Sequence, residues 1–194
     1  MTGIQKKQRL LTMIFGAFAI FFTGYPHVWS IYQPYVMEQA GWSQGQASMC
    51  FYLALSTFVF GNIVGGRMQN CFKEKTIVWI GGGIFAAGIL ASAFLIVPIT
   101  LPMYLSYGVM QGFGQGMIYT VILATVQRWF PDRTGFASGV VVTANGLCGF
   151  FLAPLSRKLL EAEGVQKTFL IIGQPSQFPG SCAASFFRHP IRVW

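Results

Sequence analysis

Long apolar runs, separated by short polar or proline-containing breaks, dominate the pattern of this chain. A membrane-spanning helix needs about 20 mostly apolar residues. Five runs approach or exceed that length: Leu10–Tyr32, Gln46–Val64, Thr76–Val97, Met103–Val126 and Phe136–Leu155. Each run is continuous and does not alternate between apolar and polar residues, which favours helices over the strands of a membrane barrel. The pattern predicts an all-α membrane protein with five transmembrane helices.

A sixth apolar run begins at Thr168–Gly173 but does not continue. The seven residues that follow contain two prolines and a glycine. Proline removes backbone hydrogen bonds that a lipid-facing helix cannot replace. We therefore expect an incomplete sixth helix, a single domain over residues 1–173, and an aberrant or disordered tail over residues 174–194. The alternative for the tail is a genuine short extracellular segment.

The distribution of positive charge predicts the orientation in the membrane. The chain has 13 Lys and Arg, 5 Asp and Glu, and a formal net charge of +8. Basic residues on the side of the N-terminus are Lys6, Lys7, Arg9, Arg67, Lys73, Lys75, Arg128 and Arg133. The first two breaks on the opposite side, around Glu38–Gly45 and Pro98–Pro102, contain no Lys or Arg. Because Lys and Arg prefer cytoplasmic loops, the N-terminus is predicted to be cytoplasmic.

Composition argues against several other classes of protein. Only 9% of the residues are charged and 54% are hydrophobic, whereas a soluble domain has about 25% charged residues. The basic residues lie between apolar runs and form no stripe with aromatic residues, so a lipid bilayer is the expected partner and nucleic acid is not. The four cysteines are scattered and lack metal-ligand spacing, so no metal or other cofactor is expected. The apolar runs contain no ionisable pair, and an enzyme is not expected.

The fourth apolar run contains glycines at a helical spacing. Gly108, Gly112 and Gly116 recur every four residues and so share one helix face. Small residues at this spacing allow the backbone of another helix to approach closely. The pattern predicts that this helix packs tightly against a neighbour through its glycines.

Beside the glycines runs a polar series with the same spacing, Gln111, Gln115 and Tyr119. Glutamines near the middle of a membrane cost free energy unless they bind a partner or line a wet cavity. One interpretation is that the series faces a solute path. The other is that these side chains only form hydrogen bonds with neighbouring helices.

The first apolar run contains a second candidate site, at Pro26, His27 and Trp29. Proline frees a backbone carbonyl one turn earlier, and broken helices in transporters often lie near binding sites. His27 could gain or lose a proton near neutral pH. The alternative is an interfacial belt of aromatic residues with a hydrogen-bonded histidine.

The stretch Arg128–Gly139, which reads RWFPDRTGFASG, resembles the loop between the fourth and fifth helices of the oxalate/formate antiporter family. That family belongs to the major facilitator superfamily. Supporting similarities are Gly114-Gln115-Gly116 with Tyr119, Trp29–Tyr32 and Ala153–Leu155. The resemblance covers about residues 10–173.

The resemblance implies the N-terminal helix bundle of a twelve-helix transporter for small carboxylates, with helices one and four lining a central cavity. Tyr119 matches a position of the family that faces the substrate. Asn70 occupies the place of an aspartate in the gating loop between helices two and three, and Asp132 and Arg133 belong to the loop motif between helices four and five. The family's carboxylate-binding cations lie in its second six helices.

We therefore expect a fragment of a secondary transporter for small carboxylates such as oxalate, formate or pyruvate, inactive alone. A small organic anion is the expected partner if a second half completes the site. The alternatives are a half-size membrane protein that dimerises, or one that only interacts with partners without transport. The sequence leaves the oligomeric state open.

Overall fold

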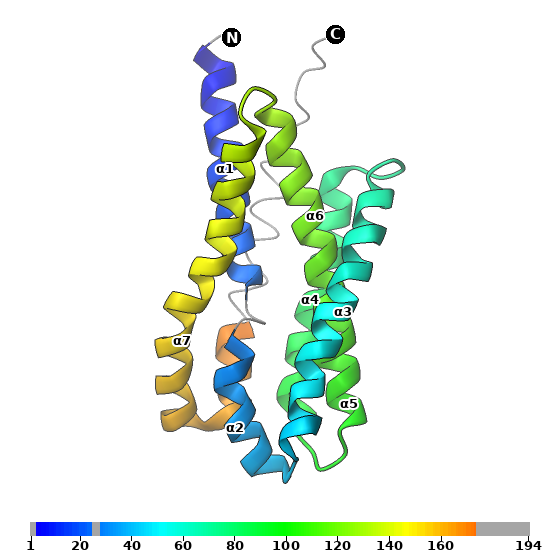
Figure 1. Ribbon diagram of the computed structural model, residues 1–194, viewed down its shortest axis with the longest axis vertical. Coiled ribbons are helices and arrows are strands. Elements are labelled where there is room, and N and C mark those ends of the chain that lie inside the picture. Colours follow the sequence, from blue (N-terminus) through cyan, green and yellow to red (C-terminus); the bar gives the residue numbers. More distant parts are fainter. Residues whose placement is uncertain (1–2, 25–27, 174–194) are drawn as a thin grey trace.

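The computed structural model describes residues 3–24 and 28–173, and the side chains of residues 8–24 and 28–172. This part of the chain is an elongated bundle of helices without strands (Figure 1). Its elements are α1 (Gly3–Thr23), α2 (Trp29–Ala40), α3 (Gln44–Met68), α4 (Glu74–Phe94), α5 (Leu101–Met103), a π-helix η2 (Tyr104–Gln111), α6 (Gly112–Trp129) and α7 (Thr134–Gly173). The predicted all-α fold is confirmed.

Within the described residues, four continuous helical stretches are long and apolar enough to cross a membrane. They are Gln44–Met68, Glu74–Phe94, Leu101–Trp129 and Thr134–Ile172, and they correspond to the second to fifth predicted spans. The third of these stretches combines α5, η2 and α6. Gln8–Thr23, within α1, is a shorter apolar helix.

The first predicted span, Leu10–Tyr32, has wrong boundaries. In the structure α1 ends at Thr23, and α2 continues past Tyr32 to Ala40 with Pro34 inside it. The helix stops only where Gly41 adopts a left-handed φ of 69° and its N–H donates to the Met37 carbonyl oxygen. Glycine takes this conformation at little cost, so it ends helices where the loss of apolar residues alone does not.

Near its end α7 contains a sharp bend at Gly164, where φ is 77° and ψ is 176°. Beyond the bend the chain turns back towards the bundle (Figure 1). The Phe169 ring lies 4.9 Å from the Tyr32 ring and 6.2 Å from the Tyr107 ring, between centroids. The start of the predicted sixth helix is therefore helical and packed into the core. The predicted tail, residues 174–194, lies outside the described residues.

The connections of the bundle lie at two opposite ends. The start of α1 and the α3–α4 and α6–α7 loops lie at one end, and the α2–α3 and α4–α5 loops lie at the other (Figure 1). The described basic residues that the sequence assigns to the N-terminal side fall in or next to the loops of the first end. The orientation of this end towards the cytoplasm stays a prediction.

Thiol labelling can test this orientation, because Cys71 is exposed while Cys50 and Cys148 are buried. In a Cys182→Ser background, a membrane-impermeant maleimide is expected to label Cys71 only after the membrane is permeabilised, since positive loops stay in the cytoplasm. A matched control carries Cys71→Ser and Ser43→Cys at the opposite end and should be labelled in intact cells. Labelling of Cys71 in intact cells would reverse the orientation.

Candidate functional site

The seam between α3 and α6 has almost no room for side chains. A Cβ atom on Gly116 would lie 2.2 Å from the Phe58 carbonyl oxygen, and one on Gly61 would lie 2.2 Å from the Phe113 carbonyl oxygen. Both distances are far shorter than van der Waals contact, so the two backbones touch directly. The predicted glycine face, made by Gly108, Gly112 and Gly116, is confirmed, and its partner is α3.

Two glutamines of the polar series lie inside the bundle. Gln111, at the end of the π-helix η2, is 0% exposed, and Gln115 is 5% exposed. Among all described residues, none forms a hydrogen bond with the amide oxygen or nitrogen of Gln111. A buried amide without partners costs free energy, and short π-helices often mark functional sites. Gln111 is thus the polar side chain of the series whose hydrogen-bonding groups are buried without a described partner.

Tyr119, the third residue of the series, has a different environment. Its side chain is only partly buried, and its ring centroid lies 5.5 Å from that of Phe58 on α3. The series therefore runs from the interior of the bundle at Gln111 to its surface at Tyr119.

Trp29 begins α2 and is 2% exposed. Its indole N–H donates a hydrogen bond of 3.1 Å to the Ala47 carbonyl oxygen, and its ring lies 4.4 Å from the Tyr107 ring between centroids. These contacts join α2 to α3 and η2. His27, the neighbouring candidate, lies outside the described residues.

The candidate gating residues lie in the loops at the end where α1 begins. Asn70 is exposed, and its backbone N–H donates to the Arg67 carbonyl oxygen at 3.1 Å. Arg133 is also exposed, and its carbonyl oxygen accepts a hydrogen bond of 3.1 Å from the Ala137 N–H in the first turn of α7. Both residues thus shape their loops through the backbone and leave their side chains at the surface.

Asp132 links the α6–α7 loop to α1. Its carboxylate accepts a hydrogen bond from Arg9, whose guanidinium also lies 4.0 Å from the centroid of the Phe130 ring. The hydrogen bond from Arg9 lowers the pKa of the Asp132 carboxyl group below its ordinary value. The carboxylate is therefore charged at neutral pH, and its stabilising contact is lost only as the pH falls through this lowered pKa.

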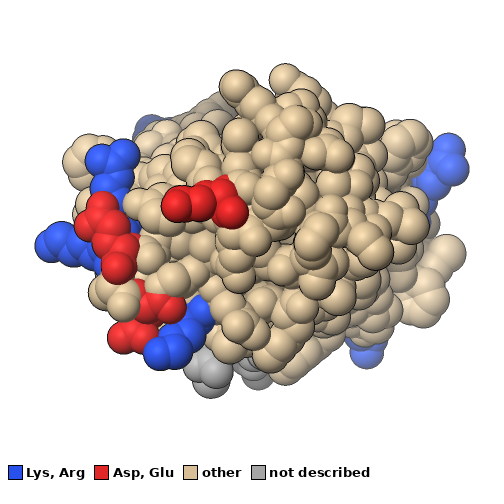
Figure 2. Space-filling view, turned by 90° about the horizontal axis from the view of Figure 1, so that it is seen from below, with Lys and Arg blue, Asp and Glu red and all other residues tan. Residues whose placement is uncertain are grey.

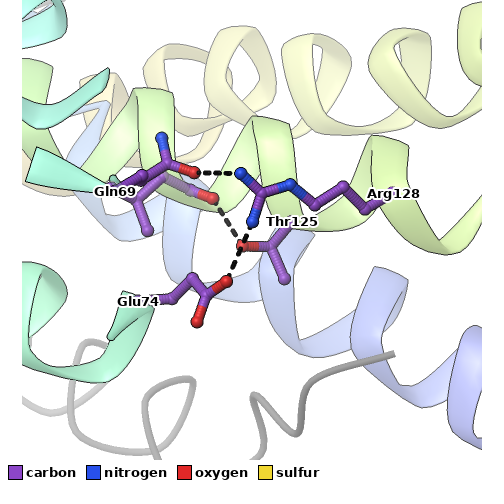
Figure 3. Close-up of polar contacts among 5 residues, drawn as sticks. Gln69, Glu74, Thr125 and Arg128 are labelled. Atoms are coloured by element: carbon purple, nitrogen blue, oxygen red, sulfur yellow. Dashed lines mark hydrogen bonds and ion pairs between the residues drawn. The ribbon is translucent and has the colours of Figure 1, made fainter. Parts of the chain in front are cut away.

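A second charged contact ties α4 to α6 at the same end (Figure 3). Arg128, in the last turn of α6, donates 2.9 Å to a Glu74 carboxylate oxygen and 3.0 Å to the Gln69 side-chain oxygen. Glu74 stands in the first turn of α4, and each charge is placed favourably for the dipole of its helix. The Arg9–Asp132 and Arg128–Glu74 ion pairs together connect α1, α4 and α6 at this end of the bundle, and we call them the two clamps.

Comparison with known proteins identifies the fold. The family model described as Major Facilitator Superfamily matches residues 11–178. The chain belongs to the major facilitator superfamily. A crystal structure of the POT family transporter PepTSo matches with a TM-score of 0.71 at 17% identity, covering 93% of this chain and 36% of that one. At this identity the likeness shows the superfamily's fold alone.

Sequence relatives cover most of this superfamily chain. It is 26% identical to the uncharacterized MFS-type transporter YhjX of Escherichia coli over 168 residues, 87% of the chain. It is 27% identical to the oxalate:formate antiporter of Oxalobacter formigenes over 78% of the chain, and 30% identical to human monocarboxylate transporter 11 over 68%. The matched part spans 41%, 35% and 28% of these relatives, respectively.

Sequence reasoning missed several residues that shape this major-facilitator bundle. Gly61 and Gly65 are spaced four residues apart in the second apolar run, and that spacing could have identified the partner of the α6 glycines. Glu74 is the only acidic residue between Arg67 and Lys75. An acidic residue in such a basic segment could have been identified as a candidate for an ion pair. Nothing in the sequence indicated that Arg128 would be its partner.

Proposed function

We propose that residues 1–173 are the N-terminal half of a secondary transporter for small carboxylates such as oxalate, formate or pyruvate. The observation that carries this proposal is the similarity, over most of the chain, to proteins described as an oxalate:formate antiporter and a monocarboxylate transporter. The chain spans 35% and 28% of those two proteins. This supports a second half as the source of the remaining helices.

In this proposal the solute-contacting groups come from the start of α2 and the segment before it, and from η2 and α6. Gln111, Gln115 and Tyr119 supply hydrogen bonds, and His27 and Trp29 supply an aromatic wall. The buried amide of Gln111 has no hydrogen-bond partner within the described residues, which supports a role towards a ligand. A polar group that is kept in an apolar interior at a cost to stability is a typical mark of function.

The same site lacks a positive charge. No Lys or Arg lies in the middle of the five apolar runs, and an unpaired carboxylate costs several kcal/mol or more in a low-dielectric interior. The cation must then come from a second half, so the chain alone binds a carboxylate weakly and does not transport it. The two clamps, Arg9–Asp132 and Arg128–Glu74, would close the end that carries the gating loops with Asn70 and Arg133.

A thermal-shift series in detergent tests this function. Oxalate, formate and pyruvate are expected to raise the melting temperature by a few degrees at concentrations about tenfold above Kd, whereas chloride at equal ionic strength should not. Tyr119→Phe and Gln115→Leu should reduce the shift. In liposomes the same protein should match empty liposomes in uptake of the radiolabelled solutes.

Each alternative predicts a different result in this series. A protein that only interacts with partners would show no carboxylate-dependent shift. A half-size transporter that dimerises would show saturable uptake in the liposomes. Either result would overturn the proposed function.

A further inference from the structure

A charged cavity of about 550 Å³ lies between α2 and α7, at the end of the bundle away from the start of α1. Ser30, Tyr35 and Glu38 of α2 line it, together with Arg157 and Glu161 of α7. Figure 2 looks onto this end and shows basic and acidic side chains gathered along one side, while most of the face is uncharged. The volume suits a small molecule.

The charges that line this cavity do not neutralise one another. Arg157 and Glu161 are four residues apart on α7, yet within the described ranges neither they nor Glu38 form an ion pair. Further along α7, on the two sides of the bend at Gly164, Glu163 and Lys167 do pair, at 2.7 Å. An acidic residue that precedes a basic one along a helix makes the better pair, and Arg157 with Glu161 has the opposite order.

Two hydrogen bonds hold α2, which forms one wall of the cavity, in place. The Tyr32 hydroxyl, on a side chain that is 0% exposed, donates 3.2 Å to the hydroxyl of Ser156, the residue before Arg157. The Gln33 side-chain amide donates 3.0 Å to the Ser48 hydroxyl on α3. The segment of α2 that carries the cavity residues is therefore held against α7 and α3 without a ligand.

The lining selects a ligand class by its charge. Arg157, Glu38 and Glu161 all line the space, so a simple anion meets a net negative charge and a simple cation meets Arg157. We propose that the cavity binds a small zwitterion that carries one carboxylate and one ammonium group, such as an α-amino acid. Arg157 holds the carboxylate through two parallel hydrogen bonds, and Glu38 and Glu161 hold the ammonium.

The hydroxyl groups of the cavity complete the site. Ser30 and Tyr35 also line the cavity, and in this proposal their hydroxyl groups donate to the ligand carboxylate beside Arg157. This binding needs only the described helices and no second half, so it goes beyond the proposed transport function. Exposed charge pairs are weak in water, and we expect a Kd in the millimolar range.

Saturation-transfer difference NMR on the whole 194-residue chain in detergent tests the ligand class. The probes are alanine, propionate and ethylamine, which have similar size and carry both charges, only the carboxylate or only the ammonium. Alanine is expected to bind at least about tenfold more tightly than either of the other two, because only it engages both sets of charges. No binding of alanine, or equal binding of propionate, would overturn the proposal.

Substitutions then locate the site. Arg157→Gln and Glu161→Gln should each weaken alanine binding by up to about fivefold. Lys158→Gln and Glu163→Gln remove the same charges from exposed neighbours that do not line the cavity, and should leave binding unchanged. Equal loss in the controls would refute the site. Because all four positions are exposed, unchanged circular dichroism is expected and verifies folding.

The two proposals fail separately. A carboxylate-dependent thermal shift that depends on Tyr119 but not on Arg157 belongs to the polar series on η2 and α6. Binding of alanine that depends on Arg157 but not on Tyr119 belongs to the cavity between α2 and α7. Oxalate binding to the cavity more tightly than alanine would replace the zwitterion with an anion and overturn this inference alone.

Discussion

Gly116→Ala is expected to destabilise the bundle by about 3 kcal/mol, the upper end of the usual cost of overpacking. The new Cβ atom would lie 2.2 Å from the Phe58 carbonyl oxygen and 2.9 Å from the Asn62 backbone nitrogen. Both are backbone atoms, so no side chain can rotate away, and α3 and α6 must separate. Thermal unfolding in detergent should show a melting temperature lower by roughly 10 °C.

Gly83→Ala in α4 is the matched control, since a Cβ atom there meets nothing within 4 Å. Alanine favours a helix over glycine by up to about 1 kcal/mol, so this variant should be as stable as the parent or slightly more stable. The contrast separates packing from helix propensity, because both variants make the same chemical change in a helix. Equal melting temperatures for the two variants would show that the glycine face is not a tight seam.

The spans were predictable because a continuous apolar run of about 20 residues is rare outside membrane-spanning helices. The boundaries of the first span were not, because they depend on two local features of the backbone. Pro34 is accommodated inside α2, although proline usually ends a helix, and Gly41 ends it by adopting a left-handed conformation. Gly41 was visible in the sequence, whereas the accommodation of Pro34 depends on the surroundings of α2.

Long-range pairs in the candidate site could not be predicted in the same way. The spacing of the glycines on η2 and α6 predicts a close neighbour without naming it, and the structure identifies α3. The contacts of Asp132 with Arg9 and of Glu74 with Arg128 join residues far apart in the sequence. Their partners follow from the packing of whole helices, and a single sequence carries no local signal for that.

For the polar series on η2 and α6, the structure adds the burial of each side chain, which the spacing in the sequence does not give. The sequence leaves open whether Gln111 faces a solute path or a hydrogen-bonding neighbour. The structure buries it completely, and no described residue binds its amide. Gln111→Met is therefore expected to stabilise the bundle by about 2 kcal/mol, because it removes two unsatisfied polar atoms and keeps the length of the side chain. The melting temperature should rise by roughly 5 °C.

Gln33→Met is the control for this change, because the Gln33 amide donates to the Ser48 hydroxyl at 3.0 Å. That variant loses a hydrogen bond and should be less stable by about 1 kcal/mol. If Gln111 contacts the solute, the stabilised Gln111→Met protein should also lose its carboxylate-dependent thermal shift, since a residue kept at a cost to stability is kept for function. A lower melting temperature for Gln111→Met would mean that the amide has a hydrogen-bond partner in the membrane. Its assignment as an unsatisfied amide that binds the solute would then be wrong.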